Sequence, residues 1–338
     1  MIKLYFGLII LNFFIFINLK KIANFVNIFD NPDGKLKLHK KKIPIAGGFI
    51  LAINFTLIFL YQILYLKKFF IFDIESIQNI ELLSLLILIY GYFFLGLYDD
   101  KFHLNPLRRI IVSIFIISTA IFLNKNLMIT DFSLTFYDKR IFFGNFSFIF
   151  TIFCILILIN SLNFYDGING QSCLIFITFF TYLLFKSDFN LFYLICTLLI
   201  FIIAILNFKN MLFLGDSGVY LLSIILSISL IYEHNVQNNI SYADEIFFLL
   251  LLPGFDLVRL TITRMFNSKN PLLGDRKHIH HLLVSKFSLT VSNTILFSFS
   301  ILPVVLFIFL ELNFFLIFCI FIIIYIFLIQ FLNSGDKK

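Results

Sequence analysis

Long runs without a charged residue are the feature that most restricts what this chain can fold into. Such windows cover residues 43–66, 141–165, 189–208, 287–310 and 312–335. Each is long enough to cross a bilayer core of about 30 Å as a helix. Because 60% of the 338 residues are hydrophobic and only 13% are charged, the composition is not that of a soluble globular domain. We therefore expect an integral membrane protein.

The apolar segments predict an all-α, polytopic fold with about eleven transmembrane helices, ten to twelve being the range. We expect one integral membrane domain over residues 1–338, without a separate soluble domain. Alternating polar and apolar residues in the loop 124–145 indicate a small hairpin. The expected spans are residues 3–19, 43–66, 80–98, 109–123, 146–163, 172–186, 190–206, 218–233, 244–262, 290–311 and 313–332.

The basic residues predict how the chain is oriented in the membrane. Of the 26 Lys and Arg residues, 19 fall on the side that holds the loop after the first span, and 7 fall on the other side. By the positive-inside rule the first side is cytoplasmic. The net charge of +7 then reflects orientation and contact with anionic membrane lipid, and we expect no nucleic acid as a partner.

Ionisable side chains that could carry chemistry gather on the predicted cytoplasmic side. Such groups are costly near a membrane and usually mark function. Carboxylates surrounded by basic residues suit a magnesium-bound phosphate, because hard cations take oxygen ligands and bridge to phosphates. We therefore expect a phosphorylated cytosolic substrate. The group comprises Asp30, Asp33, Asp99, Asp100, Asp166, Asp216, Asp256, Asp275, His39, His278, His280 and His281.

The segment GLYDDKFHLNPLRR, at the end of the third expected span, is the sharpest single motif. Asp99 and Asp100 cannot both ionise cheaply in a low-dielectric site unless a cation compensates, and Arg109 is nearby. The functional interpretation is a metal-binding or general-base pair. The alternative is an ordinary solvated helix end.

Two further segments place polar residues at the ends of spans. NSLNFYDGING carries Asn163, Asp166 and Asn169, whose amides and carboxylate can bind a base, a ribose or a metal. FLGDSG places Asp216 at the start of a span. The simpler alternatives are a polar helix cap followed by a turn for the first segment, and an aspartate near a helix N-terminus for the second.

The segment GDRKHIHHLL brings three histidines into four residues, beside Arg276. His278, His280 and His281 form a compact donor set suited to a diphosphate. Zinc binding and a basic loop that only sets topology are the alternatives. The basic segment DNPDGKLKLHKKKIPIAGG is also explained by topology if it is taken alone.

Taken in order, these five segments resemble the polyprenyl-phosphate N-acetylhexosamine-1-phosphate transferase family, also called glycosyltransferase family 4. The family's first aspartate motif is matched by Asp99, Asp100, Leu104 and Arg109, its Asn-rich motif by Asn160, Asn163, Asp166 and Gly167, and its GDxG by Gly215, Asp216 and Gly218. Asn169 stands where the family usually has a second aspartate. The branch that makes polyprenyl-diphosphate-GlcNAc is indicated by Pro44, Gly47, Gly48, Asp275, Arg276, His278, His280 and His281.

The resemblance implies transfer of an N-acetylhexosamine 1-phosphate, foremost GlcNAc 1-phosphate, from a UDP-sugar to undecaprenyl phosphate with release of UMP. Such a reaction initiates a cell-surface glycan of the O-antigen, common-antigen or teichoic-acid type. The cofactor implied is Mg²⁺, with Mn²⁺ as a substitute. The resemblance also implies a multi-pass protein of the bacterial inner membrane whose active site faces the cytoplasm, and it admits a homodimer.

The resemblance also implies roles for individual residues. Asp99 and Asp100 are expected to be catalytic, and Asn163 and Asp216 to hold the metal. Nucleotide-sugar binding is expected from Asp166, Asn169, Arg109, His278, His280 and His281, and contact with the lipid phosphate or diphosphate from Lys35, His39 and Arg276.

Two other functions remain open at this stage. One is phospho-N-acetylmuramoyl-pentapeptide transfer in peptidoglycan synthesis, a branch that typically has three consecutive histidines, whereas Ile279 interrupts them here. The other is a multi-spanning transporter of lipid-linked sugars. Transporters usually place charged groups near the bilayer midplane, whereas the carboxylates here are expected at the cytoplasmic ends of spans.

Overall fold

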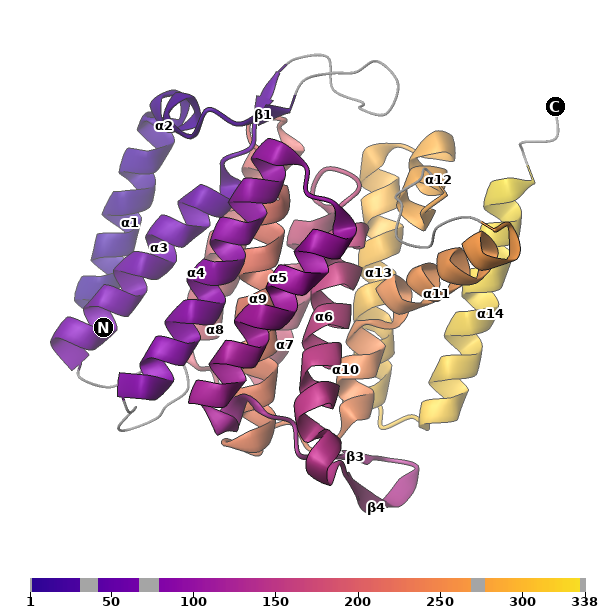
Figure 1. Ribbon diagram of the computed structural model, residues 1–338. Helices are drawn as coiled ribbons and strands as arrows, with labels where there is room; N and C mark the ends of the chain where they lie inside the picture. Colours follow the sequence, from indigo (N-terminus) through magenta and orange to yellow (C-terminus); the bar gives the residue numbers. More distant parts are fainter. Residues whose placement is uncertain (1, 31–41, 67–78, 269–276, 335–338) are drawn as a thin grey trace.

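The computed structural model of the chain describes residues 2–30, 42–66, 79–268 and 277–334. They form a bundle of long helices that run roughly side by side (Figure 1). One end of the bundle carries α12 and the strand β1, and we call it the site end. The other carries β3 and β4, and we call it the hairpin end. The fold expected from the apolar windows is confirmed.

The helices and strands have the following bounds. The α-helices are α1 (Ile2–Ile17), α2 (Leu19–Val26), α3 (Gly47–Tyr61), α4 (Asn79–Phe102), α5 (Pro106–Leu123), α6 (Ser147–Tyr165), α7 (Gln171–Lys186), α8 (Leu191–Phe208), α9 (Gly215–Asn235), α10 (Ala243–Leu249), α11 (Leu251–Phe266), α12 (Ile279–Lys286), α13 (Leu289–Ile308) and α14 (Phe314–Asn333). Shorter elements are a π-helical turn (Gln62–Leu66), two 3₁₀ turns (Lys125–Leu127 and Gly144–Phe146), and the strands β1 (Phe29–Asp30), β2 (Ile43–Pro44), β3 (Asp131–Leu134) and β4 (Tyr137–Phe142).

The predicted spans correspond to helices of the bundle. Among the described residues, eight helices are long and apolar enough to cross a membrane, two bent pairs could each form one more span, and α7 is a shorter apolar helix.

Polar caps set several helix starts. The Asn105 side chain accepts a hydrogen bond from Leu107 N at 3.0 Å, and Pro106 occupies the first turn, where a missing N–H costs little.

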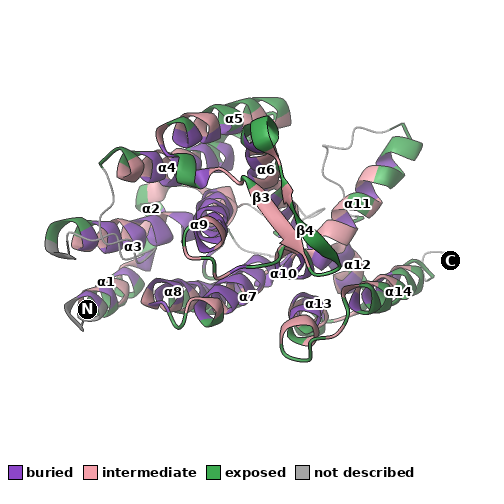
Figure 2. Cartoon of the chain, turned by 90° about the horizontal axis from the view of Figure 1, so that it is seen from below, coloured by how far each residue is buried: buried purple, intermediate pink, exposed green. Residues whose placement is uncertain are grey.

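Helix α9 is the centre of the bundle. Of the residues in its apolar window, 89% are buried, against 22% for α5 and for α14. It packs on α3, α4, α6 and α7, and in Figure 2 it lies inside the ring of its neighbours. Small residues such as Ser223, Ser227 and Ser229 allow close packing. The hydroxyls of Ser227 and Ser229 donate within α9, to Ser223 O and Ile225 O, each at 2.8 Å.

Two helix pairs are bent rather than straight. The axes of α1 and α2 differ by 77°, and those of α10 and α11 by 70°. The expected span 3–19 ends where α1 gives way to α2, whereas the expected span 244–262 runs across the break between α10 and α11. Pro253 supplies a physical reason for the second bend, because its ring removes one backbone donor and crowds the carbonyl of the preceding turn. Figure 1 shows α11 inclined against α13 and α14.

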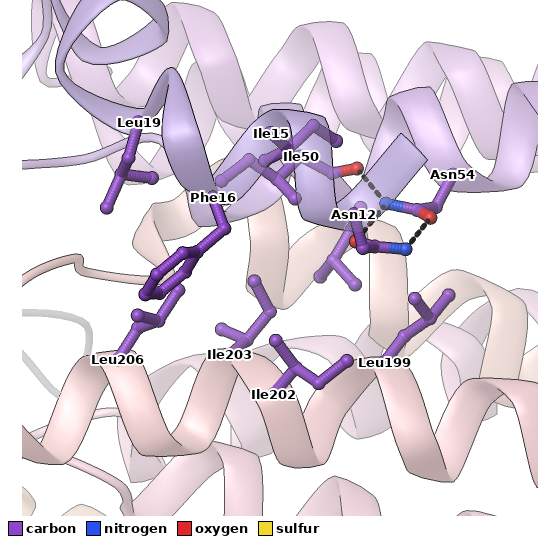
Figure 3. A pocket seen from close by; sticks show the side chains of 11 residues that line it. Asn12, Ile15, Phe16, Leu19, Ile50, Asn54, Leu199, Ile202, Ile203 and Leu206 are labelled. Atoms are coloured by element: carbon purple, nitrogen blue, oxygen red, sulfur yellow. Dashed lines mark hydrogen bonds between the residues drawn. The ribbon is translucent and has the colours of Figure 1, made fainter. Parts of the chain in front are cut away.

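An amide pair fixes α1 to α3 inside the bundle. Asn12 Nδ2 donates to Asn54 Oδ1 at 2.7 Å, and Asn54 Nδ2 donates back to Asn12 Oδ1 at 3.2 Å. Both point into a small crevice that is otherwise lined by apolar side chains of α1, α2, α3 and α8 (Figure 3). The crevice has a volume of about 20 Å³, enough for roughly one water molecule. It is therefore too small to be a substrate site.

Two short antiparallel pairs complete the described fold. Phe29 pairs with Pro44 in β1–β2 at the site end, and β3–β4 forms the hairpin that the loop 124–145 predicts. The hairpin is attached to α10, because the Asp244 carboxylate accepts a hydrogen bond from Thr135 N at 2.6 Å.

Candidate active site

Four aspartates from three regions of the chain meet at the site end. Asp99 and Asp100 close α4, Asp166 follows α6, and Asp216 begins α9. The Asp216 carboxylate lies within electrostatic reach of the other three and of the Arg109 guanidinium on α5. The structure thus brings together five side chains that the sequence predicts at one site.

The Asp99 carboxylate is fully engaged. Its Oδ1 accepts from Leu104 N at 2.7 Å, and its Oδ2 accepts from Arg109 Nη1 at 3.1 Å and from the Tyr220 hydroxyl at 3.0 Å. The side chain of Asp99 exposes 5% of its surface and that of Arg109 15%. At such burial the ion pair needs all of these hydrogen bonds to offset the loss of water. Asp99 therefore fixes the direction of the Arg109 guanidinium.

Asp100 holds the first turn of α9. Its Oδ1 accepts from Asp216 N at 2.8 Å and its Oδ2 from Ser217 N at 3.0 Å. These are two of the backbone donors that a helix N-terminus leaves without a partner, so a carboxylate is favourable there. Gly215 precedes them at φ +75°, and a Cβ on it would meet the Asp100 carboxylate at 2.9 Å. The glycine is therefore required both by conformation and by contact.

Two glycines let α3 and α4 approach α9 at the same place. A Cβ on Gly48 would lie 2.4 Å from Gly218 N, and one on Gly96 would lie 2.4 Å from Ser217 Cα. Both contacts are to backbone, which cannot rotate away. The position of Asp216 is therefore set by close backbone packing as well as by Asp100.

Asp216 and Asn163 have the chemistry that a hard cation requires. No described residue donates a hydrogen bond to the Asp216 carboxylate, and no described side chain pairs with the Asn163 amide. Both residues are partly exposed. Carboxylate and amide oxygens are suitable Mg²⁺ ligands, and the surrounding carboxylates add negative charge. Among the described residues, no three His, Cys, Asp or Glu side chains are placed so that they could bind one ion together, so such a site would be completed by water and substrate phosphate, as Mg²⁺ sites usually are.

Asp166 is the most exposed of the four aspartates. Loss of hydration among the surrounding protein groups raises the pKa of the Asp166 carboxyl to about 6. The hydroxyl of Ser172, which donates to this carboxyl, opposes the rise, and the negative charge of Asp100 adds to it. Its side chain is nevertheless reached by solvent, which moderates the electrostatic cost of ionising it.

The loop after Asp166 is clamped from two helices. Gly170 N donates to the Asn207 side chain of α8, and the Asn293 amide of α13 donates to Asn169 O at 2.9 Å. The Asn169 side chain itself donates to Asn210 Oδ1 at 2.6 Å. The side chain of Asn169, which stands where the family usually has an aspartate, is thus bonded to the turn that follows α8.

The three histidines lie beside this loop. The rings of His278 and His280 are stacked with centroids 5.3 Å apart and planes 7° apart, and the His281 ring lies 4.3 Å from that of His280. A Cβ on Gly167 would come within 1.8 Å of His280 Nε2. The histidine segment and the DG motif are therefore in direct contact, and only glycine fits at 167.

The three histidines differ in exposure. His280 exposes 1% of its surface and His278 6%, whereas His281 is partly exposed. Burial lowers the pKa of His280 well below its usual value, and the neighbouring histidines act in the same direction. A neutral, enclosed imidazole supports the loop at Gly167 rather than supplying positive charge to a diphosphate. His281 is the better placed of these to meet a ligand.

Several contacts of the site were missed by the sequence analysis. Tyr220 and Ser172 bond to Asp99 and Asp166, but each reads as an ordinary residue of an apolar helix. Asp256 was expected at a helix end and lies inside α11, bonded to His278 and to Arg259. The i, i+3 spacing of Asp256 and Arg259 was the signal available in the sequence.

The predicted lipid-phosphate contacts Lys35, His39 and Arg276 lie outside the described residues, as do Asp33 and Asp275.

Comparison with known proteins agrees with this arrangement. Residues 82–234 match the model of glycosyl transferase family 4, a range that includes all four aspartates of the cluster. Three curated relatives carry the name undecaprenyl-phosphate alpha-N-acetylglucosaminyl 1-phosphate transferase. That of Escherichia coli is 24% identical over 277 residues, and that of Salmonella typhi 25% identical over 278, each covering 78% of this chain and 71% of the relative. That of Thermotoga maritima is 26% identical over 296 residues, covering 87% of this chain and 85% of the relative. In its motifs, its fold and these matches the chain is similar to members of glycosyl transferase family 4.

Proposed function

We propose that the protein transfers N-acetylglucosamine 1-phosphate from UDP-GlcNAc to undecaprenyl phosphate and releases UMP. The observation that carries the proposal is the cluster of four aspartates at one end of a membrane bundle, with the Asp216 carboxylate free of described hydrogen-bond donors and Arg109 beside it. The names of the curated relatives support the same substrates, and they favour this reaction over pentapeptide transfer.

In the proposed reaction an oxygen of the lipid phosphate attacks the β-phosphorus of the nucleotide sugar. The bond from that phosphorus to the oxygen bridging the two phosphates breaks, and UMP leaves with the bridging oxygen and its electron pair. Phosphoryl transfer of this kind asks the protein mainly for positioning and charge neutralisation. No covalent intermediate on the protein is required.

Each described residue has a part that its contacts support. Asp99 holds Arg109 so that the guanidinium faces the anionic cluster and can bind a phosphate oxygen in fork geometry. Asp100 holds the α9 N-terminus and so positions Asp216. Asp166, close to the clamped loop, is available to the uridine side of the donor.

Asp216 and Asn163 would hold Mg²⁺, and Mn²⁺ could replace it. When bound, the ion neutralises charge on the diphosphate. We place the site end on the cytoplasmic face of the bacterial inner membrane, because loops on that side carry most of the Lys and Arg residues and nucleotide sugars are cytosolic.

The experiment is a label-transfer assay on purified protein in detergent, with undecaprenyl phosphate, Mg²⁺ and UDP-GlcNAc labelled in the sugar. We expect label to move into the lipid with one UMP released per transfer, and added UMP to reverse it. Asp216→Asn should sharply lower transfer at a fixed Mg²⁺ concentration. Asp244→Asn, a buried carboxylate at the hairpin end, should not.

Two outcomes would count against the proposal. Transfer from UDP-MurNAc-pentapeptide but not from UDP-GlcNAc would assign the protein to the peptidoglycan reaction. No transfer from either donor, with protein that unfolds cooperatively on heating, would argue against the enzyme altogether.

A further inference from the structure

Asp256 is a buried carboxylate that the proposed reaction does not use directly. It lies inside α11 and exposes 3% of its surface. Its Oδ1 accepts from Arg259 Nη2 at 2.6 Å and from the Tyr325 hydroxyl of α14 at 3.1 Å. Its Oδ2 lies 2.9 Å from His278 Nδ1, and Ile279 N lies 3.2 and 3.3 Å from the two oxygens.

These contacts assign the proton on His278. Arg259 and the Ile279 amide can only donate, and the Tyr325 hydroxyl accepts from Arg259 Nε at 2.8 Å, so its own proton is directed to Asp256. Asp256 is therefore an ionised carboxylate that acts only as an acceptor. It follows that His278 Nδ1 carries a proton and donates it, and a neutral His278 has its lone pair on Nε2.

The same group fixes where the histidine segment begins. Arg259 Nη2 also donates to Lys277 O at 2.6 Å, and the bond from Ile279 N ties the first turn of α12 to Asp256. The His278 ring then stacks on His280, and its centroid lies 6.1 Å from that of Phe164. Stacking on His280 fixes the plane of the His278 ring, and the bond to Asp256 fixes which edge of the ring faces the carboxylate.

The held ring is connected to the aspartate cluster. His280, stacked on His278, abuts Gly167, which directly follows Asp166. The bend of 70° between α10 and α11 brings Asp256 to this loop, although it lies ten residues before the last residue of α11. Side chains of two membrane helices thus control the orientation of the histidine segment.

We propose that Asp256, supported by Arg259 and Tyr325, is a positioning residue that sets the tautomer and orientation of His278 for the nucleotide-sugar site. The inference rests on the proposed function for its kinetic consequence. The tautomer itself is independent of any activity.

The test is Asp256→Asn, a change that preserves shape. Because Arg259 and Tyr325 still donate, the new amide oxygen will face them and the amide nitrogen will face His278. The ring must then accept at Nδ1, so its neutral form should carry the proton on Nε2. Nitrogen-15 NMR of histidine-labelled protein, with the His278 signals identified by their loss in His278→Gln, measures this directly.

In label transfer we expect Asp256→Asn to lower kcat by about 10- to 100-fold, by analogy with the range for removing the orienting partner of a metal-ligating histidine. The matched control is Asp244→Asn. It makes the same substitution in the same bent helix pair, on a carboxylate exposing 1% of its surface, but at the hairpin end. The control should keep both kcat and the His278 tautomer, whatever its effect on the unfolding temperature.

A second measurement tests the coupling by kinetics, and the tautomer of His278 in the wild-type protein tests the assignment even where Asp256→Asn folds poorly. If Asp256 acts through His278, adding Asp256→Asn to His278→Gln should lower kcat no further. If the two residues act independently, their fold losses in kcat should multiply. Tyr325→Phe, which leaves the bond between Asp256 and His278 in place, should retain the wild-type tautomer.

The outcomes separate this inference from the proposed function. An unchanged tautomer, or multiplying losses in the double variant, overturns the positioning role while leaving the reaction intact. A wild-type protein that transfers no label rejects the proposed function, and the tautomer measurement still decides the assignment of Asp256.

Discussion

Replacing Gly96 by alanine should disable the site without unfolding the bundle. The new Cβ would lie 2.4 Å from Ser217 Cα, 2.6 Å from Ser217 N and 2.7 Å from Asp216 O. Ordinary contacts begin near 3.4 Å, so the first turn of α9 must move away from α4 by about 1 Å. None of the three atoms belongs to a side chain that could rotate instead.

The shift acts on the bonds that place Asp216. Asp216 N and Ser217 N donate to the Asp100 carboxylate at 2.8 and 3.0 Å, and a retreat of about 1 Å stretches both bonds beyond hydrogen-bonding range. Overpacking of this kind costs about 1–3 kcal/mol of stability, which a bundle of this size can tolerate. A misplacement of about 1 Å at a reacting site can cost about 100-fold in rate. We therefore expect Gly96→Ala to lose about 100-fold in kcat.

The assay is label transfer with Gly91→Ala as the matched control. Gly91 lies on the same helix, but the three atoms nearest to its added Cβ all belong to the Ile116 side chain, the first at 3.1 Å, and that side chain can yield by a few tenths of an ångström. The control should stay within about twofold of wild type. Equal activities of the two variants, both confirmed as folded by thermal unfolding, would refute the argument that backbone contact at Gly96 places Asp216.

Three further predictions follow from other contacts. Chelation should stop transfer and Mg²⁺ should restore it, and Asp216→Asn should raise the Mg²⁺ concentration for half-maximal rate; an unaltered requirement in that variant would exclude Asp216 as a ligand. Because the pKa of Asp166 is raised to about 6, its carboxyl stays protonated to higher pH than usual, so the transfer rate should fall as pH drops through about 6. In Asp166→Asn that inflection should disappear, and its persistence would assign it to another group. Finally, Asn12→Leu or Asn54→Leu alone should lower the free energy of unfolding by about 0.6–1.7 kcal/mol, with a smaller loss in the double variant; additive losses would mean that the pair shown in Figure 3 does not interact.

The fold could be predicted to a useful degree because the bilayer core requires every spanning segment to be apolar and to form its backbone hydrogen bonds internally. Charge-free windows located the helices, and alternation in the loop 124–145 located the hairpin that becomes β3–β4. The bend between α10 and α11 was missed because the apolar pattern continues through it. Leu250 separates α10 from α11 with no change in composition, and Pro253 was the one local signal of a break.

The membership of the site was easier to predict than its contacts. Motifs identify which aspartates matter, since carboxylates at a membrane edge are costly unless used. They do not show which oxygen meets which donor. The adjacent Asp99 and Asp100 read as one functional pair, yet one binds Arg109 and Tyr220 while the other binds the backbone of α9. Only the packing of α4 against α9 separates these roles.

The Gly167 contact explains why the histidine segment belongs to the same site although the family match ends at residue 234. His280 Nε2 occupies the space that any side chain at 167 would need, and buried packing of that kind leaves no room for adjustment. Asp166 on one side of the glycine faces the other aspartates, and His280 on the other side stacks on His278, which Asp256 holds. A displacement of α11 relative to α6 must therefore reach the aspartates through Gly167, or open a gap beside it. The aspartates and α11 are thus connected by packing through Gly167 and the histidines. Substitutions at Gly167 should therefore couple energetically to substitutions at Asp256.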